Sequence, residues 1–450
     1  MKIRNLIVFG LIALLFGISS CRDDFDYDIA SKNLSFSSDT LNLDTIFNHT
    51  NSQTYKLTIH NHENKDIQIP RIYLSRGESS FFKLNVDGMP GSDFENVAIR
   101  KKDSIFVFVE IAAGEAPVIP EYEDEINFET TNGTQQVKLL SYIEKAEFYI
   151  PEQGQTNHNL TETLWDNSKS RVVFGNLHVM NGLYIQGGTR VYFHNGAGLT
   201  IDNGDFTVDG SINNEVIFRT DRMDERSDSL PNNWNKILIK NNPVNDSNLI
   251  KYAIIKGGNI GLEIENSHLE ISNSKILNNE KIGLYAKNAV ITGYNLVINN
   301  SDIASLAIEG GIYDFRHCTF ANYHNIGQGA GQNFSLYLSS EGNLLNAHFY
   351  NSIFYGHASD AVYIDETTSG NIIFDSNIIK GQTPLNAMNT YNEDPIFVNP
   401  GFGKNDLRLY DGSHAKDKGS STYLIPYDIK GYLRDSIPNL GAYEELVPTE

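Results

Sequence analysis

The sequence predicts an all-β protein in which an N-terminal β-sandwich is followed by a parallel β-helix, a solenoid of stacked strands. The main evidence is a repeat between about Asn248 and Gly381, where apolar residues recur at intervals in the low twenties. Repeats of this length are typical of solenoids. The runs between them are short, rich in β-branched and aromatic residues and bounded by Gly, Asn, Asp and Ser, which predicts strands. A leucine-rich solenoid is the main alternative, but the helical half of that repeat is missing.

Two series of apolar residues, called anchors because each is expected to stack on the next, define the repeat. The first series is Ile255, Leu277, Ile298, Phe320, Phe354 and Ile379, and the second is Leu262, Leu284, Leu306, Leu336 and Val362. A single turn of the solenoid, or rung, cannot bury its inner face alone, so the stack must be continuous. We expect the asparagines at 278–279, 299–300 and 322 to stack at one corner, because Asn tolerates positive φ and its amide can hydrogen-bond along the stack.

Residues 1–20 are a predicted lipoprotein signal peptide. Lys2 and Arg4 precede the apolar run 6–18, which is too short for a comfortable transmembrane helix. The run ends in Ile-Ser-Ser-Cys, which resembles a bacterial lipobox and implies cleavage before Cys21 and acylation of that cysteine. Two or three acyl chains would anchor the protein stably in a membrane. An ordinary signal peptide with an unmodified cysteine is the alternative.

Residues 21–31 are a predicted acidic tether. Asp23 and Asp24 lie in the sequence CRDDFDYD, which resembles the surface-export signal of Bacteroidota lipoproteins. The resemblance implies a location in the outer membrane, with the protein facing the cell exterior. The alternative is a solvated tether without a signal, since short charged runs are common in tethers.

Residues 32–148 have no 22-residue period and contain about seven strand-like runs separated by turn residues. This spacing predicts an immunoglobulin-like β-sandwich. The prediction depends on strand number alone, because the segment lacks the cysteine pair and the buried-tryptophan signature. Residues 149–168 are polar and predicted to be a linker, and 169–390 are predicted to form the β-helix. Trp234, which opens a strand after a long polar loop, is expected to seal a strand end.

Three stretches carry a family resemblance: NNWNKILIK at 232–240, GGIYDFRHCTFANY at 310–323, and a C-terminal pattern. The pattern comprises Asp394-Pro395-Ile396-Phe397, Leu407-Arg408-Leu409, Gly412-Ser413, Ala415, Asp417, Gly419, Asp428, Gly431, Arg434 and Gly441-Ala442-Tyr443-Glu444. Together they resemble Bacteroidota lipoproteins of the right-handed parallel β-helix superfamily over residues 170–446. The sequence departs at His414, where proline is usual, and at Asn439, where aspartate is. The resemblance implies a right-handed coil, and we expect residues 391–450 to cap the last rung.

The residues favour binding over catalysis. A formal charge of −21 argues against a nucleic-acid partner, since phosphate binding depends on Lys and Arg. No Cys/His spacing resembles a metal site, and no cofactor is expected. Cys318 has no disulfide partner and is expected in the core.

Tyr313, Phe315 and His317 alternate on a strand and are expected to face the core. A β-helix lyase needs a base and a group that neutralises a carboxylate, and a hydrolase needs two or three neighbouring carboxylates. No catalytic residues are evident, and superfamily membership does not decide activity.

We therefore expect an outer-membrane lipoprotein that acts as a binding or structural module of the cell envelope, with a glycan or an envelope protein as partner. The alternative is a polysaccharide lyase or glycoside hydrolase. An insertion at 321–334 enlarges one rung, and a ligand site is predicted at that corner, because aromatic rings stack on sugars and polar groups bind their hydroxyls. A lateral loop without a ligand is the alternative. The predicted ligand-binding residues are Tyr323, His324, Gln328, His357 and Asp360.

Overall fold

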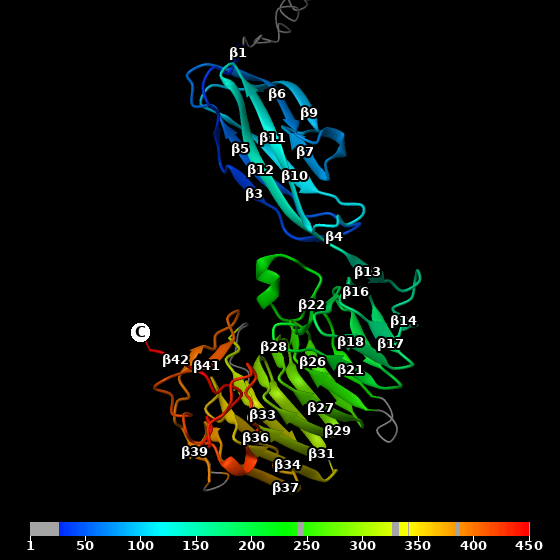
Figure 1. The fold of residues 1–450 in the computed structure, drawn as a ribbon, viewed down its shortest axis with the longest axis vertical. Helices are drawn as coiled ribbons and strands as arrows, with labels where there is room; N and C mark the ends of the chain where they lie inside the picture. Colours follow the sequence, from blue (N-terminus) through cyan, green and yellow to red (C-terminus); the bar gives the residue numbers. More distant parts are fainter. Residues whose placement is uncertain are drawn as a thin grey trace, which may run out of the picture. The chain divides into compact units, whose positions relative to one another are not determined.

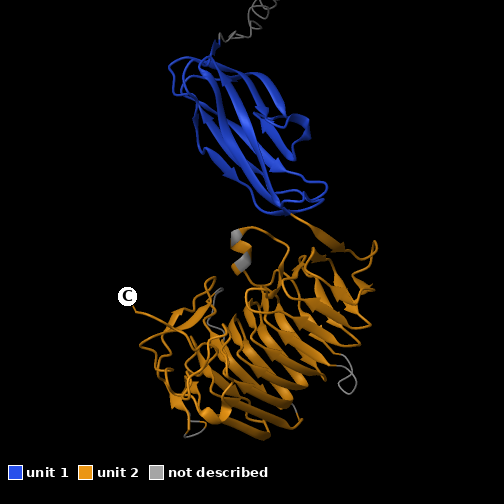
Figure 2. Cartoon of the chain, viewed as in Figure 1, with its two compact units in different colours: residues 1–143 blue, residues 144–450 orange. Residues whose placement is uncertain are grey.

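The computed structural model describes residues 27–240, 247–325, 333–340, 342–382, 385 and 388–449. The chain divides into two compact units, residues 1–143 and 144–450 (Figure 2). The described residues form β-strands and three short 3-10 helices, with no α-helix, which confirms the all-β prediction. None of the helices in this described part is long and apolar enough to cross a membrane.

The first unit consists of two β-sheets that enclose one hydrophobic core, with Ile69 and Ile126 from one sheet and Leu57 and Val107 from the other completely buried in it. One sheet contains β1 (Asp28–Ile29), β3 (Thr40–Asn42), β4 (Ile46–Phe47), β6 (Ile67–Leu74), β9 (Asp93–Ile99), β11 (Glu121–Thr130) and β12 (Gly133–Glu144). The other contains β2 (Ser35–Phe36), β5 (Tyr55–His60), β7 (Phe82–Val86), β8 (Met89–Gly91) and β10 (Ser104–Ile111). Strands alternate between buried and exposed residues, as expected of a sheet with one face on the core.

The second unit is built from three ladders of parallel strands, and a parallel β-helix fits this arrangement (Figure 1). Ladder A contains β13 (Ala146–Tyr149), β16 (Ser170–Val173), β19 (Arg190–Phe193), β22 (Val216–Thr220), β25 (Ala253–Lys256), β28 (Lys275–Asn279), β30 (Val297–Ser301), β32 (Thr319–Asn322), β35 (Ile353–Gly356), β38 (Ile378–Ile379) and β39 (Thr390–Tyr391). The interior of the second unit is one continuous core, formed by Leu, Ile, Val and Phe side chains from all three ladders.

Ladders B and C share two long strands, β29 (Ile282–Tyr294) and β31 (Ala304–Arg316), each of which runs through a corner and contributes to both. Ladder B contains β14 (Asn157–Leu160), β17 (Asn176–Val179), β20 (Gly198–Ile201), β23 (Ile237–Ile239), β26 (Ile260–Glu265), the first halves of β29 and β31, β33 (Phe334–Ser339) and β36 (Val362–Ile364). Ladder C contains β15 (Leu164–Trp165), β18 (Leu183–Gln186), β21 (Phe206–Asp209), β24 (Asn248–Lys251), β27 (His268–Ser272), the second halves of β29 and β31, β34 (Leu345–Tyr350) and β37 (Gly370–Asp375).

The strand registers confirm the second anchor series at every step, since Leu262, Leu284, Leu306, Leu336 and Val362 are partners in succession. The first series needs one correction. Ile255 pairs with Ile276, and Ile276 pairs with Ile298, so Ile276 rather than Leu277 stacks inside the solenoid. Neighbouring residues on a strand face opposite ways, and Leu277 points outward. It is nevertheless buried, in a second core described below.

Asparagines stack at two corners of the solenoid. Asn278 and Asn300 both have positive φ, and Nδ2 of Asn300 donates a hydrogen bond of 3.1 Å to Oδ1 of Asn278, as predicted. A second column with positive φ comprises Asn273, Asn295, His317, Asn351 and Ser376. Asn is among the few residues besides Gly that tolerate this conformation, which explains why Asn punctuates the rungs.

The segment 149–168, predicted to be a linker, is part of the solenoid. Strands β14 and β15 lie in it and pair in parallel with β17 and β18. Leu160 and Trp165 are buried in the solenoid core. The segment was predicted to be a linker because Leu160 and Trp165 are surrounded by polar residues in the sequence.

Tyr391, at the start of the predicted cap, pairs with β38 and packs against the solenoid core, but most of the described C-terminal segment lies along the outside of ladder A (Figure 1). It contains β40 (Phe397–Asn399), β41 (Asp406–Tyr410) and β42 (Leu446–Val447). Its apolar side chains form a lateral core with outward-facing residues of ladder A; the lateral core comprises Leu277, Val297, Ala321, Ile353, Ile378, Phe397, Leu407, Leu409, Ala415, Ile429, Leu440, Ala442 and Tyr443. A lateral position buries apolar surface on several rungs, whereas a cap would cover only one.

Candidate functional site

The lipidation and export residues Cys21, Asp23 and Asp24 lie outside the described residues.

Of the five residues predicted to bind a ligand, the structure brings two into contact with each other. Gln328 lies outside the described residues. Tyr323 is partly buried and contacts the ring of His357 edge-to-face at 5.2 Å and that of Phe397 at 6.2 Å. Burial raises the pKa of the Tyr323 hydroxyl.

The remaining two residues of that corner contact other parts of the protein. His324 is 5% exposed and lies edge-to-face on Phe402 of the C-terminal segment. Asp360 Oδ1 accepts a hydrogen bond of 2.8 Å from the backbone N–H of Gln382. The structure therefore brings Tyr323 and His357 together, whereas His324 contacts Phe402 and Asp360 contacts the backbone of Gln382. Ligand binding at this corner stays a prediction.

Both His317 and Cys318 were predicted to lie in the solenoid core, and the structure confirms this for Cys318 but not for His317. Tyr313, Phe315 and Cys318 lie in the solenoid core, as predicted, and burial raises the pKa of the Cys318 thiol to about 12. His317 does not face that core, because β31 ends at Arg316 and the positive φ of His317 turns the chain at the corner. It is buried there, and Nε2 accepts a hydrogen bond of 3.0 Å from Nδ2 of Asn351. Trp234 is buried against Phe193 and donates to the carbonyl of Lys256, which confirms its structural role.

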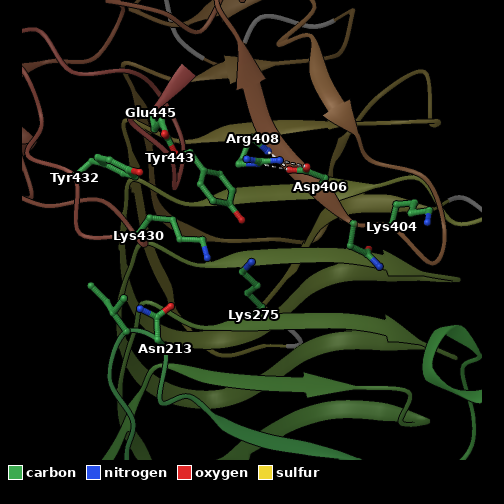
Figure 3. Close-up of a pocket in the computed structure, with 11 residues that line it drawn as sticks. Asn213, Lys275, Lys404, Asp406, Arg408, Lys430, Tyr432, Tyr443 and Glu445 are labelled. Carbon is green, nitrogen blue, oxygen red and sulfur yellow. Dashed lines mark hydrogen bonds and ion pairs between the residues drawn. The ribbon is translucent and has the colours of Figure 1, made fainter. Parts of the chain in front are cut away.

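A pocket of about 670 Å³ lies where the C-terminal segment meets ladder A (Figure 3). Lys275 of β28 contributes from the solenoid, and Ile212 and Asn213 from the turn between β21 and β22. All the other lining residues belong to the C-terminal segment: Lys404, Asn405, Asp406, Arg408, Lys430, Tyr432, Tyr443 and Glu445.

Asn405 fixes this part of the C-terminal segment to the asparagine corner of the solenoid. Its Nδ2 donates 3.0 Å to Oδ1 of Asn278, and its Oδ1 accepts from Nδ2 of Asn299 at 2.9 Å and of Asn300 at 2.7 Å. The hydrogen bonds of a buried polar group are costly to lose, so this contact positions the pocket wall firmly.

Both acidic residues of the pocket, Asp406 and Glu445, already accept hydrogen bonds from other pocket residues. Arg408 donates from Nε at 2.9 Å and Nη2 at 2.6 Å to the two carboxylate oxygens of Asp406. This hydrogen bonding lowers the pKa of Asp406. A hydrogen bond to Glu445 raises the pKa of the Tyr432 hydroxyl. Among the described residues, Lys275 and Lys430 have no ion-pair partner.

A second surface lies on the outer face of ladder B, where residues that directly follow the second anchors stack in register. They are Glu263, Tyr285, Ala307, Tyr337 and Tyr363. The rings of Tyr337 and Tyr363 are stacked at 5.3 Å and 19°, and Phe334 stacks on Tyr363 at 5.0 Å. The three tyrosines are partly exposed. We call Tyr285, Tyr337 and Tyr363 the tyrosine column.

Charges of alternating sign run beside the tyrosine column. Asp202, Lys240, Glu265, Lys287 and Glu309 occupy one column of ladder B. Lys240 lies 3.1 Å from Asp202 and Lys287 lies 3.1 Å from Glu309, and Tyr285 donates 2.7 Å to Glu309. The outer face of ladder B therefore combines aromatic rings with charged hydrogen-bonding groups.

Glu263 is the most perturbed carboxylate on this face. Its side chain is 6% exposed and lies 2.6 Å from Nζ of Lys236. Burial raises the pKa of Glu263, and a hydrogen bond with Glu265 raises it further, against the effect of Lys236. Glu263 and Glu265 therefore place two carboxyl groups beside one another on this face.

The tyrosine column left a signal in the sequence that the prediction missed, whereas the pocket left none. Tyrosine directly follows Leu284, Leu336 and Val362, and residues that follow stacked anchors must themselves stack on the other face. Leu277 was predicted to be the inward-facing anchor, and in that register Lys275 would also face inward. Its partners Lys404, Lys430 and Tyr443 lie far along the chain, and no sequence spacing joins them to Lys275.

The described residues contain no group of three or more His, Cys, Asp or Glu that could hold a metal ion. No protein-family model matches the chain, and no curated protein matches it. The chain has 10% identity and a TM-score of 0.19 to a family 123 glycoside hydrolase from Clostridium perfringens, studied for glycolipid glycan hydrolysis. That match covers 26% of this chain and 30% of the hydrolase, and it is too slight to indicate a shared fold or activity.

Proposed function

We propose that this protein is a surface-exposed lipoprotein of a Bacteroidota outer membrane whose parallel β-helix binds glycans. The observation that carries the proposal is the tyrosine column on the outer face of ladder B. Tyr337 and Tyr363 lie on successive rungs, which repeat at about 4.8 Å, and form a stacked aromatic surface, whereas Ala307 separates them from Tyr285. Tyrosine rings stack on the apolar faces of sugar rings, and their hydroxyls remain available for hydrogen bonds.

The charged column beside the tyrosines supports the same function. Glu309 and Lys287 lie within hydrogen-bonding distance of each other next to Tyr285, at the edge of the aromatic surface. Sugar hydroxyls both donate and accept hydrogen bonds, so carboxylates and amines at this edge can select the orientation of a stacked sugar. An envelope protein with exposed glycans is a partner of the same chemistry.

The other parts of the chain are assigned by resemblance. In this proposal the coil is right-handed, Cys21 carries the lipid, Asp23 and Asp24 direct export to the surface, and the two-sheet first unit is an immunoglobulin-like spacer between membrane and solenoid. The acidic composition supports an exposed, soluble ectodomain, since high net charge opposes self-association.

Glycan binding is tested with the full chain in detergent, on immobilised glycans and by titration calorimetry. The double substitution Tyr337→Ala and Tyr363→Ala is expected to weaken binding at least about tenfold, because each stacked ring contributes on the order of 1 kcal/mol. Tyr184→Ala is the matched control, as this exposed tyrosine lies in ladder C. Equal affinity of the double variant and the control would reject the tyrosine column as the site.

A glycoside hydrolase is the second candidate, and the position of Glu263 beside Glu265 on the outer face of ladder B favours it. Glu263 would donate the proton to the leaving oxygen and a neighbouring carboxylate would complete the pair. Release of reducing sugar that disappears in Glu263→Gln would establish this activity. Products that absorb in the ultraviolet through a new double bond would indicate a lyase instead. The absence of both products on a broad glycan panel favours binding without catalysis.

Localisation is tested separately. Cys21→Ala is expected to yield an unlipidated protein that leaves the membrane fraction, because acyl chains supply the anchor. Substitution of Asp23 and Asp24 by Ala should retain the lipid but protect the protein from protease added to whole cells. Unchanged membrane association of the first variant, or unchanged protease sensitivity of the second, contradicts the corresponding assignment.

A further inference from the structure

The pocket between ladder A and the C-terminal segment is a concentration of positive charge in an acidic protein. The chain has a formal charge of −21, yet four cationic and two acidic side chains line the pocket. The two acids are occupied by Arg408 and Tyr432. Arg408 is paired with Asp406, and Lys404 lies apart from the other two lysines in Figure 3, so the amino groups of Lys275 and Lys430 supply the positive charge of the central part of the pocket.

Lys275 occupies a column that holds mostly apolar residues on the rungs that follow it. Its successive partners along ladder A are Val297, Thr319, Ile353 and Ile378. Val297, Ile353 and Ile378 lie in the lateral core, and Thr319 accepts a hydrogen bond from the backbone of Ala442. A lysine at the end of this covered column is expensive for stability, because burial removes water from its ammonium group.

The carboxylates nearest to Lys275 do not compensate this cost. Asp406 and Glu215 raise the pKa of Lys275, but burial outweighs them and the pKa is lowered. Asp406 is held by Arg408, and Glu215 does not line the pocket. The Lys275 ammonium group lies over the Tyr443 ring, 5.8 Å from its centre, but has no carboxylate of its own, and an ammonium group of this kind at a pocket wall can bind an anion.

The geometry points to an oxyanion site: we propose that the pocket binds the carboxylate or sulfate group of an acidic sugar between Lys275 and Lys430. Figure 3 shows the amines of both lysines and the hydroxyl of Tyr443 directed into the same space. Two ammonium groups and one hydroxyl donor match the oxygens of one such group. The volume of about 670 Å³ suits a ligand of one to three sugar rings.

This site is separate from the tyrosine column. The choice of a sugar as carrier rests on the proposed glycan-binding function, whereas the oxyanion part depends on the pocket alone. An inorganic oxyanion has the same charged chemistry without the sugar, so the test contains both.

The test uses the full chain in detergent at low salt, titrated with trimers of galacturonic acid, of sulfated galactose and of galactose, and with inorganic phosphate. The acidic trimers are expected to bind and the neutral trimer to bind at least about tenfold more weakly at this pocket, because charge-assisted hydrogen bonds dominate. Affinity for the acidic trimers should fall as salt rises.

Two lysine variants and one control locate the site. Lys430→Gln changes an exposed residue, and Lys275→Met keeps the apolar stem, so both are expected to fold. Each should weaken binding of the acidic trimers about tenfold or more. Lys281→Gln removes the same charge from an exposed position on the same solenoid outside the pocket, and should leave the affinity unchanged.

The double variant Tyr337→Ala and Tyr363→Ala separates this proposal from the proposed function. If this variant still binds the acidic trimers, and the binding still depends on the two lysines, the pocket is a distinct site. This holds even if glycans no longer bind to the face of ladder B. Equal affinity of wild type, Lys275→Met and Lys430→Gln overturns the proposal. Lysine-dependent binding of phosphate without binding of any acidic trimer also overturns it, because the ligand is then not a sugar.

Discussion

His317 takes the place of an asparagine in a corner column, and its Nε2 accepts a hydrogen bond of 3.0 Å from Nδ2 of Asn351 on the next rung. Asn295 occupies the same place on the rung before and donates to Asn273 in the same way. His317 and all three asparagines have positive φ. The column is therefore continuous in backbone conformation, its side chains are hydrogen-bonded in pairs, and one member of it is titratable.

We expect His317→Asn to make stability less dependent on pH. Burial, and then the charge of Arg434, lower the pKa of His317 well below 6.5. Below about pH 6.5 the unfolded chain takes up a proton that the folded chain does not, so stability falls as pH falls, by at most about 1.4 kcal/mol per unit. Urea midpoints between pH 7 and 5 should fall less steeply in His317→Asn than in wild type. The exposed His268→Asn is the control, and equal slopes for all three proteins would contradict the prediction.

Arg434→Ala should destabilise the protein strongly. Arg434 is fully buried and donates 3.0 Å to Glu444, 3.0 Å to Oδ1 of Asn295 and 3.1 Å to the carbonyl of Gly441. Removal leaves Glu444 buried without its partner, which costs about 3–5 kcal/mol. Arg316→Ala breaks the more exposed pair with Asp314 and should cost about 1 kcal/mol or less. Chemical denaturation of both variants measures this difference, and similar losses would show that Arg434 is not a structural centre.

Leu284→Asp should destabilise the solenoid by several kcal/mol, since Leu284 is completely buried between Leu262 and Leu306. Ile276→Ala and Leu277→Ala are each expected to cost about 2–4 kcal/mol, but in different cores. Leu277→Ala should make the C-terminal segment the main site of cleavage in limited proteolysis. Ile276→Ala, with a similar loss of stability, should make the whole solenoid more sensitive to cleavage. Identical cleavage patterns would argue against two separate cores.

Lys275→Met should stabilise the protein in the absence of ligand. Burial lowers the pKa of Lys275, so its ammonium form is disfavoured by folding, and the replacement removes that cost at every pH below the unfolded pKa near 10.5. We expect a gain on the order of 1 kcal/mol and a higher melting temperature. Lys281→Gln, at an exposed position, should leave the melting temperature nearly unchanged. A loss of stability in Lys275→Met would mean that its charge is compensated within the protein.

The sequence by itself determined the strands, the rung length and most of the stacking. Period and alternation carry this information, because residues that stack on one another must recur once per rung and face the same way. Leu262, Leu284, Leu306, Leu336 and Val362 were identified in the correct register for that reason. Asparagine at the corners was equally predictable, since few other residues tolerate positive φ.

Only the tertiary structure decided which of two adjacent apolar residues faces inward. Ile276 and Leu277 are both buried, since the C-terminal segment covers the outside of ladder A, and hydrophobicity alone does not distinguish two cores. The pocket depends on the same contact. Asn405 reaches Asn278 across 127 residues of sequence, and this contact brings the C-terminal segment and Lys430 to Lys275. Contacts between such distant segments have no period, so their position is set by the packing of the folded chain.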